Sequence, residues 1–524
     1  MEKEYAVIVH RGINLAEFDA ELASEQGHGP IPARSVVIAD PRPGSQRMTH
    51  WMLTDEEAEE LRNDNRVLSV EIPPDQRDDI QLVLNASQTG NFYRGFNDSS
   101  DVNWGLRRVN ETTNVYDDQT TVAGDYEYAL NGEGVDVVIQ DSGIQPGHPE
   151  WEDLQGNTRL QQVDWYAVSG LSGTQSADYY RDRDGHGTHC AGIAAGKTYG
   201  WAKGAHIYSQ KLAGLETLQG ADGTGTPIST AFDAIRLWHN AKTNGRPTVV
   251  NMSWGYVTGV TGNPINGIYR GVPWTYGSDY TTDNALWDGT GVVSAFQDGS
   301  RQLPAQVAFV DAEVEDMIDA GIHVCIAAGN DYYKADIATG ADYNNTVSFT
   351  GITRNYHRPG SPYSDRAFCV GNLDSAVFDD NGTFKDRTAA SSKKGPAVNM
   401  WAPGTDIMST TSNEADAAYT VFDYPDDVNY KIMSISGTSM ASPQVAGLLA
   451  VYLQSIPTLT PDQLREKIIN DSSAELYETG SDTDYRAFTT SILGSPNRHV
   501  YSRYGKQPVV LTGSLTVSNT SIIV

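Results

Sequence analysis

The first 75 residues alternate apolar and polar segments in a pattern typical of a small α+β unit. Strand-like apolar runs lie at 5–9, 34–39, 48–53 and 67–72, and segments with helical spacing lie at 14–24 and 54–63. Thr54 and Glu57 have the spacing of a capping box at the start of the second helix. The order β-α-β-β-α-β predicts a ferredoxin-like unit over residues 1–75.

Residues 76–103 are rich in Asp, Asn, Gln and Ser and are expected to form a linker. From residue 104 onward, short apolar runs alternate with helical patterns. The apolar runs lie at 135–139, 206–212, 248–254, 322–328, 367–370 and 398–401. Continuous apolar strands between helices predict an α/β fold over 104–475, with a mostly parallel sheet and helices on both faces. Residues 476–524 would form a C-terminal extension, of which 507–524 alternates like a strand.

Composition excludes several classes of protein. A chain of 524 residues exceeds the roughly 250–300 residues at which a single core stops growing. Lys and Arg number 37 against 67 Asp and Glu, a net charge of −30, which disfavours nucleic acid as a partner. No apolar run reaches the ~18 residues of a membrane span, and the first residues lack the pattern of a secretory signal. Three cysteines are too few for a disulfide framework.

Four polar residues stand at predicted strand ends or helix starts, where α/β proteins place their chemistry. They are Asp141, His186, Asn330 and Ser439. Taken singly, each has an ordinary structural interpretation: a turn or capping residue, a structural histidine, or a metal ligand formed by His186 with His189. The metal interpretation lacks the Glu and the third ligand of a zincin-type site.

Ser439 lies where a Gly437-Thr438 turn enters an apolar helix. Free backbone N–H groups and the positive end of the helix dipole favour an oxyanion there. Pro443 is expected to fall in the first turn of this helix, where proline is tolerated.

Together, the order Asp141, His186, Asn330, Ser439 resembles the subtilisin-like serine peptidases, most closely the proteinase K branch. The resemblance covers about 104–470 and includes the segments 104–109 and 198–203. Residues 1–75 are similar to the inhibitory propeptide of that family in their pattern of elements only.

The resemblance implies that Ser439 is the nucleophile, His186 the general base and acid, and Asp141 the residue that orients His186. The Ser439 N–H and the Asn330 amide would form the oxyanion hole. An extended substrate would lie between two segments, 223–225 (Gly223, Thr224, Gly225) and 253–255 (Ser253, Trp254, Gly255). Ala327, Ala328 and Gly329 would line the pocket for the residue before the cut, and their small size favours bulky apolar side chains there. No cofactor is expected to be required. Whether a structural calcium ion binds is left open, because Asn399 stands where calcium-binding relatives often carry Asp.

Two segments depart from the family pattern as insertions, near 256–305 and 332–362. The first carries Trp274, Tyr276, Tyr280, Trp287 and Phe296. It could restrict access to the cleft, bind a partner, or simply pack.

Three hypotheses of biological role follow. The first is an endopeptidase that acts on polypeptides and is made as a zymogen, with its own N-terminal prodomain in the cleft. The second is a virion-associated structural or assembly protein that retains the protease fold. The third is autoprocessing only. The expected location is a virion or the extracellular space reached by another route, with the cytoplasm left open.

Overall fold

The structure is a computed structural model. It describes residues 2–42, 44–73, 76–77, 81–84, 101–114, 126, 128–153, 155–215, 224–295, 299–479, 485 and 490–504. The predicted strand at 507–524 therefore lies outside the described residues.

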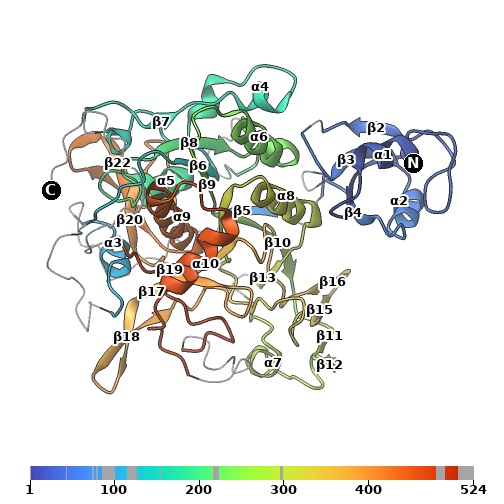
Figure 1. Cartoon of the computed structure of the whole chain (residues 1–524). Coiled ribbons are helices and arrows are strands. Elements are labelled where there is room, and N and C mark those ends of the chain that lie inside the picture. The colour runs from blue at the N-terminus through green and yellow to red at the C-terminus, as the bar shows by residue number, and fades with distance from the viewer. Residues whose placement is uncertain are drawn as a thin grey trace.

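A mostly parallel sheet forms the centre of the larger unit (Figure 1). Its strands are β6 (Asp136–Asp141), β7 (Leu160–Gln161), β8 (His206–Lys211), β9 (Thr248–Met252), β14 (His323–Ala327), β17 (Phe368–Asp380), β18 (Thr383–Thr388) and β19 (Met400–Pro403). The strand order is β18-β17-β14-β9-β6-β8-β7, and β19 also pairs with β17. Only the β17–β18 pair is antiparallel. The predicted α/β class is confirmed.

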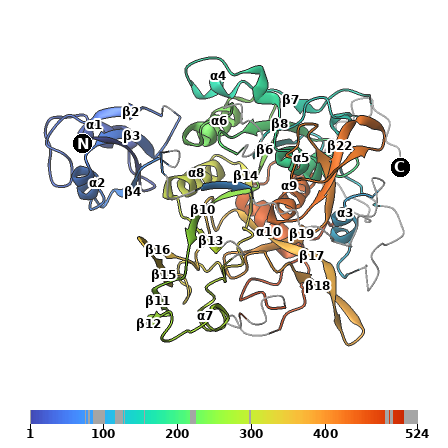
Figure 2. The same ribbon diagram turned by 180° about the vertical axis from the view of Figure 1, so that it is seen from behind.

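Helices cover both faces of this sheet, as its apolar strands require. On one face lie α5 (His186–Ala195) and α9 (Thr438–Ser455), with α3 (Trp104–Val109) and α10 (Pro461–Asp471) nearby. On the other lie α6 (Ile228–Ala241) and α8 (Ala308–Asp319) (Figure 2). Each face has its own apolar core. Every residue of α5 is buried, so this helix lies inside the molecule rather than on its surface.

The N-terminal unit is a separate lobe beside α8 (Figure 1). Its elements are β1 (Lys3–Val9), α1 (Leu15–Leu22), β2 (Val37–Asp40), β3 (Met48–Leu53), α2 (Asp55–Leu61) and β4 (Val67–Glu71). The sheet is antiparallel with the order β2-β3-β1-β4. The capping box of Thr54 and Glu57 is formed as the sequence predicts.

Part of the predicted linker is a strand, which corrects that prediction. Residues 81–84 form β5 (Gln81–Leu84), which pairs antiparallel with β10 (Trp254–Thr261). On its other edge, β10 pairs with β13 (Ser300–Pro304). The apolar run at 82–84 is three residues long, too short by itself to predict a strand whose partner lies about 170 positions away in the sequence.

The two segments that the sequence treats as insertions pack against each other. Their strands form one sheet from β11 (Asn266–Tyr269), β12 (Val272–Thr275), β15 (Thr346–Phe349) and β16 (Ile352–Asn355). Trp274 is buried in the core of this sheet, near α7 (Asp283–Thr290), and Trp287 contacts Tyr485. Trp274 and Trp287 therefore both pack against other side chains of this chain. Phe296 lies outside the described residues.

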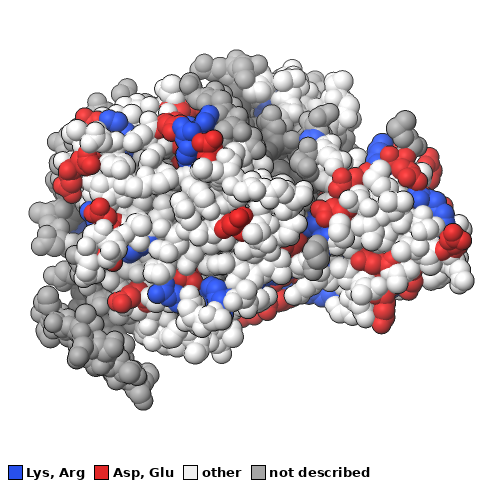
Figure 3. All heavy atoms as spheres, turned by 90° about the horizontal axis from the view of Figure 1, so that it is seen from above, with Lys and Arg blue, Asp and Glu red and all other residues white. Residues whose placement is uncertain are grey.

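The remaining elements are α4 (Trp165–Ser169), β20 (Ile407–Thr411), β21 (Val421–Tyr424), β22 (Asp427–Ile435) and two short 3-10 helices at Pro149–Trp151 and Ala177–Tyr180. None of the helices in the described part of the chain has the length and hydropathy to cross a bilayer. On the face shown in Figure 3, Asp and Glu side chains gather on the N-terminal lobe, and the middle of the larger unit has few charges.

Candidate active site

Asp141 and His186 form a buried pair at the carboxyl edge of the sheet. Asp141 is the last residue of β6 and His186 is the first residue of α5. Their Oδ1 and Nδ1 atoms are 2.8 Å apart, and both side chains are fully buried. Asp141 Oδ1 also accepts a hydrogen bond from the Ser142 N–H at 2.7 Å. The contact between Asp141 and His186 is the kind that holds an imidazole in one tautomer for proton transfer.

The close approach of β6 and α5 depends on Gly187. A Cβ atom at this position would lie 2.2 Å from the Gly143 carbonyl oxygen and 3.1 Å from Asp141 Cβ. Because the nearest neighbour is backbone, it cannot rotate away, so only glycine fits beside His186.

The charge of Asp141 alters the titration of His186. Burial alone would lower the pKa of the imidazole, but the adjacent Asp141 carboxylate, aided by Cys190, raises that pKa well above its ordinary value of 6.5. The imidazolium is therefore stabilised at the position where a general base must receive a proton.

Two carboxylates that the sequence analysis missed support the loop before His186. Asp182 accepts hydrogen bonds from the Ser142 hydroxyl at 2.9 Å and from the Thr188 hydroxyl at 2.6 Å. Asp184 accepts from the His186 N–H at 3.2 Å. Burial, reinforced by Asp182, raises the pKa of Asp184 to about 7. The repeated Asp before Gly185 was the available signal in the sequence.

Ser439 is the second residue of α9 and is fully buried. Its hydroxyl donates to the Ser253 carbonyl at 3.0 Å rather than to His186. Among the described residues, His186 Nε2 has no hydrogen-bond partner. The Cys190 thiol lies near other atoms of the same two residues, at 3.9 Å from His186 Nδ1 and 3.5 Å from the Ser439 carbonyl oxygen. Catalytic hydrogen bonds often form only when substrate is bound, so this arrangement is compatible with a Ser–His pair.

Pro443 lies inside α9, five residues after the helix begins, and not in its first turn as expected. Proline lacks an N–H, so the carbonyl four residues earlier, that of Ser439, receives no helical hydrogen bond. That carbonyl instead accepts from the Ser253 hydroxyl at 2.9 Å and the Cys190 thiol at 3.5 Å. The proline thus leaves the Ser439 carbonyl free to link the start of α9 to Ser253, which follows β9, and to Cys190 in α5.

Asn330 follows β14 and is oriented by Thr438. Its Oδ1 accepts from the Thr438 N–H at 2.9 Å and from the Thr438 hydroxyl at 3.0 Å. The same hydroxyl accepts from the Gly329 N–H at 3.1 Å. With the amide oxygen engaged, the amide NH₂ group is the part of Asn330 left to donate beside Ser439.

One of the two predicted substrate-binding segments is paired with the chain itself. In the β5–β10 register, Trp254 lies opposite Leu84 and Gly255 opposite Val83. Trp254 is fully buried, with its ring against Phe232 and Tyr256. In the second predicted substrate-binding segment, Thr224 and Gly225 directly precede the β-bridge between Thr226 and Leu212. Gly223 lies outside the described residues.

Of the residues expected to line the pocket for the residue before the cut, Ala327 is the last residue of β14 and Ala328 and Gly329 follow it; both alanines are buried. The space beside Gly329 is filled by Lys393, because a Cβ atom on Gly329 would lie 3.1 Å from Lys393 Cδ. The Lys393 ammonium lies 3.0 Å from Asp331 Oδ2. Neither residue is a candidate in the sequence analysis, since nothing in the local pattern links positions 62 residues apart.

In the described part of the chain, the only cluster of three His, Cys, Asp or Glu ligand atoms close enough for a metal ion is Asp141, His186 and Cys190. Burial raises the pKa of the Cys190 thiol, which disfavours the thiolate that metals bind. Asn399, the position considered for calcium, links backbone groups instead: it donates to the Ala367 carbonyl at 2.9 Å and accepts from the Cys369 N–H at 3.1 Å.

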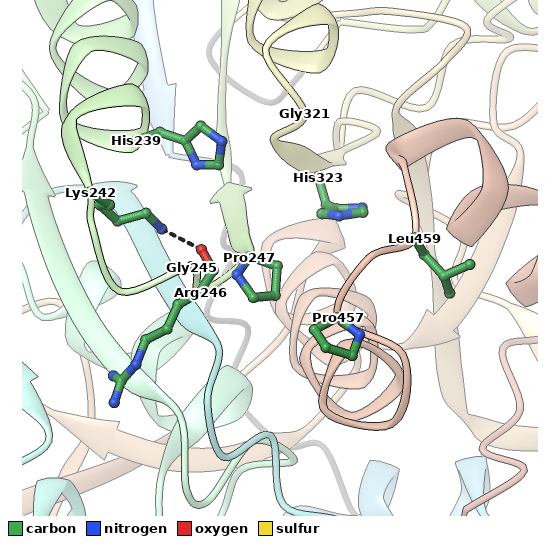
Figure 4. Close-up of a pocket in the computed structure, with 9 residues that line it drawn as sticks. All are labelled: His239, Lys242, Gly245, Arg246, Pro247, Gly321, His323, Pro457 and Leu459. Carbon is green, nitrogen blue, oxygen red and sulfur yellow. Dashed lines mark hydrogen bonds between the residues drawn. The ribbon is translucent and has the colours of Figure 1, made fainter. Parts of the chain in front are cut away.

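A hollow of about 250 Å³ lies at the amino ends of β9 and β14, on the edge of the sheet opposite Ser439 (Figure 4). Lys242 borders it but donates to the Arg246 carbonyl at 2.8 Å and to Asp136 at 2.9 Å. Burial lowers the pKa values of His239 and His323 to about 4, so both rings are neutral. The charges here are compensated within the chain, and we regard the cluster as structural.

Comparison with known proteins adds independent observations. A model of the subtilase family matches residues 132–495. A subtilisin-like proteinase of Pyricularia oryzae is 26% identical over 376 residues, which are 70% of this chain and 51% of that protein. An extracellular serine proteinase of a Thermus species is 25% identical over 409 residues, 77% of this chain and 70% of that protein.

A crystal structure of a cold adapted subtilisin-like serine proteinase has a TM-score of 0.45 and 23% identity, and covers 76% of this chain and 97% of that chain. The chain spans about half the length of the first of these relatives.

Proposed function

Because this chain belongs to the subtilase family, we propose that it is a serine endopeptidase that hydrolyses peptide bonds of polypeptides through an acyl-enzyme on Ser439. The observation that carries this proposal is the fully buried Asp141–His186 pair, 2.8 Å apart, beside the start of the helix that presents Ser439. The extracellular relative supports a site of action outside the cell.

In the proposed reaction, His186 Nε2 removes the proton of the Ser439 hydroxyl as the oxygen attacks the substrate carbonyl carbon. Asp141 stabilises the imidazolium, which then donates the proton to the leaving amine. A water molecule releases the acyl group by the same steps in reverse. Every proton transfer uses a group of this chain, so no cofactor is required.

The Ser439 N–H and the Asn330 amide are the proposed donors to the oxyanion of the tetrahedral intermediate. The two hydrogen bonds from Thr438 to Asn330 support this role, because they fix the amide before substrate arrives. Donors that need no rearrangement stabilise developing charge most effectively.

We also propose that residues 1–75 are a prodomain and that the protein is made as a zymogen. The N-terminal unit is docked on α6 and α8: Glu71 accepts from the Phe309 N–H at 2.7 Å, and Arg42 lies 2.6 Å from Asp233. The β5 strand adds to β10, the strand that begins at the predicted substrate-binding segment. An inhibitor bound in this way occupies the place of a substrate strand.

A role in autoprocessing alone agrees with the same docked unit, and an intact full-length protein after long incubation would favour it. Nothing in the described residues bears on a role in a virion, which remains an untested hypothesis.

A fluorophosphonate probe tests the proposed chemistry. We expect covalent labelling of the protein once the N-terminal unit and β5 have been released, and no labelling of Ser439→Ala. Ser442→Ala is the matched control: Ser442 is in the same helix and donates to Asn251 at 2.8 Å, away from the proposed chemistry. Failure of the released wild-type protein to react would contradict the proposal.

A further inference from the structure

A buried lysine lies beside the residues expected to line the pocket for the residue before the cut. A Cβ atom on Gly329, one of those residues, would lie 3.1 Å from Lys393 Cδ and 3.3 Å from Cε. A Cβ atom on Gly360 would lie 3.7 Å from Lys393 Nζ and 3.2 Å from the Tyr256 carbonyl oxygen. The Lys393 side chain therefore runs from Gly329 to Gly360, which lies beside the start of β10.

Backbone hydrogen bonds hold these segments together. The Lys393 N–H donates to the Gly329 carbonyl at 2.9 Å, and the Tyr256 N–H donates to the Ser361 carbonyl at 2.9 Å. Ser361 directly follows Gly360. The backbone at both ends of the lysine side chain is thus fixed.

Lys393 is paired with Asp331, the residue directly after Asn330. Nζ and Oδ2 are 3.0 Å apart, and the two side chains are only 2% and 5% exposed. Asp331 Oδ1 accepts a weaker hydrogen bond from the Tyr333 N–H at 3.4 Å. An ammonium has three N–H donors, so Lys393 can donate to a substrate atom while it stays paired with Asp331. A buried ion pair is costly to desolvate and adds little to stability by itself.

We propose that the Lys393–Asp331 pair makes this pocket selective for a carboxamide side chain, asparagine or glutamine, before the cut; the proposal rests on the proposed peptidase function. The amide oxygen would accept from Lys393, and the amide NH₂ would donate to Asp331. A substrate carboxylate would face Asp331, and a substrate cation would face Lys393. A bulky apolar side chain would remove water from the pair without replacing its hydrogen bonds.

The inference replaces the expectation of bulky apolar side chains, which was drawn from the small lining residues alone.

Quenched-fluorescent peptides that differ only in the residue before the cut test the inference on the released enzyme. With asparagine, glutamine, aspartate, leucine and phenylalanine at that position, we expect kcat/KM for the better carboxamide to exceed those for leucine and phenylalanine by at least about 100-fold, because pockets that hydrogen-bond a substrate group reject analogues without it. Equal or faster cleavage after leucine or phenylalanine would overturn the proposal.

Two variants separate specificity from folding and from chemistry. In Lys393→Met/Asp331→Leu, which removes both charges together and leaves neither uncompensated, the preference should reverse toward leucine. Lys385→Met, on the outlying β18, should keep the wild-type preference. Each protein is also treated with the fluorophosphonate: a labelled enzyme without carboxamide preference contradicts this inference alone, whereas an unlabelled wild-type enzyme contradicts the proposed function.

Discussion

At the scale of single residues, a few side chains set the chemistry and its dependence on pH. Asp141 raises the pKa of His186 against the opposing effect of burial. Thr438 orients Asn330 through the amide oxygen and leaves its donors for substrate. These two relationships lead to separate predictions.

The activity should have an alkaline profile. His186 acts as a base only when it is neutral, and its pKa lies well above 6.5 in the folded protein. We therefore expect kcat/KM to rise with pH through a midpoint above about 6.5. Asp141→Asn removes the carboxylate, so the midpoint should move to lower pH while kcat falls by about 10⁴-fold. A rate profile from pH 5 to 10 checks both shifts; an unchanged midpoint in Asp141→Asn would refute the coupling.

Asn330→Asp should separate the structural role of Asn330 from its proposed catalytic role. Aspartate keeps an oxygen acceptor for Thr438 but removes both donors. We expect kcat to fall by at least about 10²–10³-fold, with the midpoint of denaturant unfolding little changed. Asn330→Leu, which removes acceptor and donors, should lose both activity and stability. Near wild-type kcat in Asn330→Asp would exclude the oxyanion role.

At the scale of elements, the sequence predicted what local pattern determines. Apolar strands and the capping box at Thr54 follow from periodicity and capping, whereas the approach of Asp141 to His186 was expected from the resemblance to a family. The pairing of β5 with β10 was not predicted, because the apolar run at 82–84 is too short to indicate a strand or its partner. Lys393 was missed for a related reason: its importance comes from contacts with Gly329 and Gly360, which only the fold brings together.

The contact between β6 and α5 predicts the effect of one methyl group. In Gly187→Ala, the added Cβ would lie 2.2 Å from the Gly143 carbonyl oxygen, so α5 must shift away from β6. A shift of about 1 Å in catalytic geometry costs on the order of 10²-fold in rate. We expect at least that loss in kcat, with a lower melting temperature. Full activity together with unchanged stability would show that the helix start tolerates a side chain.

At the scale of the whole molecule, the two units meet through a buried network of charges. Arg42 of the N-terminal unit and Arg236 of the larger unit both contact Asp233 and Glu313 of the larger unit. Arg47 of the N-terminal unit lies 2.8 Å from Asp316 of the larger unit. Such a network tolerates loss of one member poorly, because the remaining charges stay buried without compensation.

Asp233→Ala, made in the Ser439→Ala background to prevent cleavage, should therefore destabilise the docked state by about 3–5 kcal/mol. Amide hydrogen exchange measures this destabilisation. The amides of α6 and α8 that face the N-terminal unit should exchange faster in Asp233→Ala than in its background. The control Lys3→Met removes an exposed ion pair with Asp55, which should change stability by at most about 1 kcal/mol. Equal exchange in Asp233→Ala and its background would show that the network does not hold the units together.

The covalent connection between β5 and the larger unit has a consequence for the timing of activity. While the chain is intact, β5 competes for its place on β10 at the local concentration of a tethered segment, which is in the millimolar range for short connections. Once the backbone is severed after β5, the same strand rebinds only as part of a separate molecule. A freshly processed sample should then gain activity after a lag that shortens on dilution, since occupancy of the groove now follows the total protein concentration.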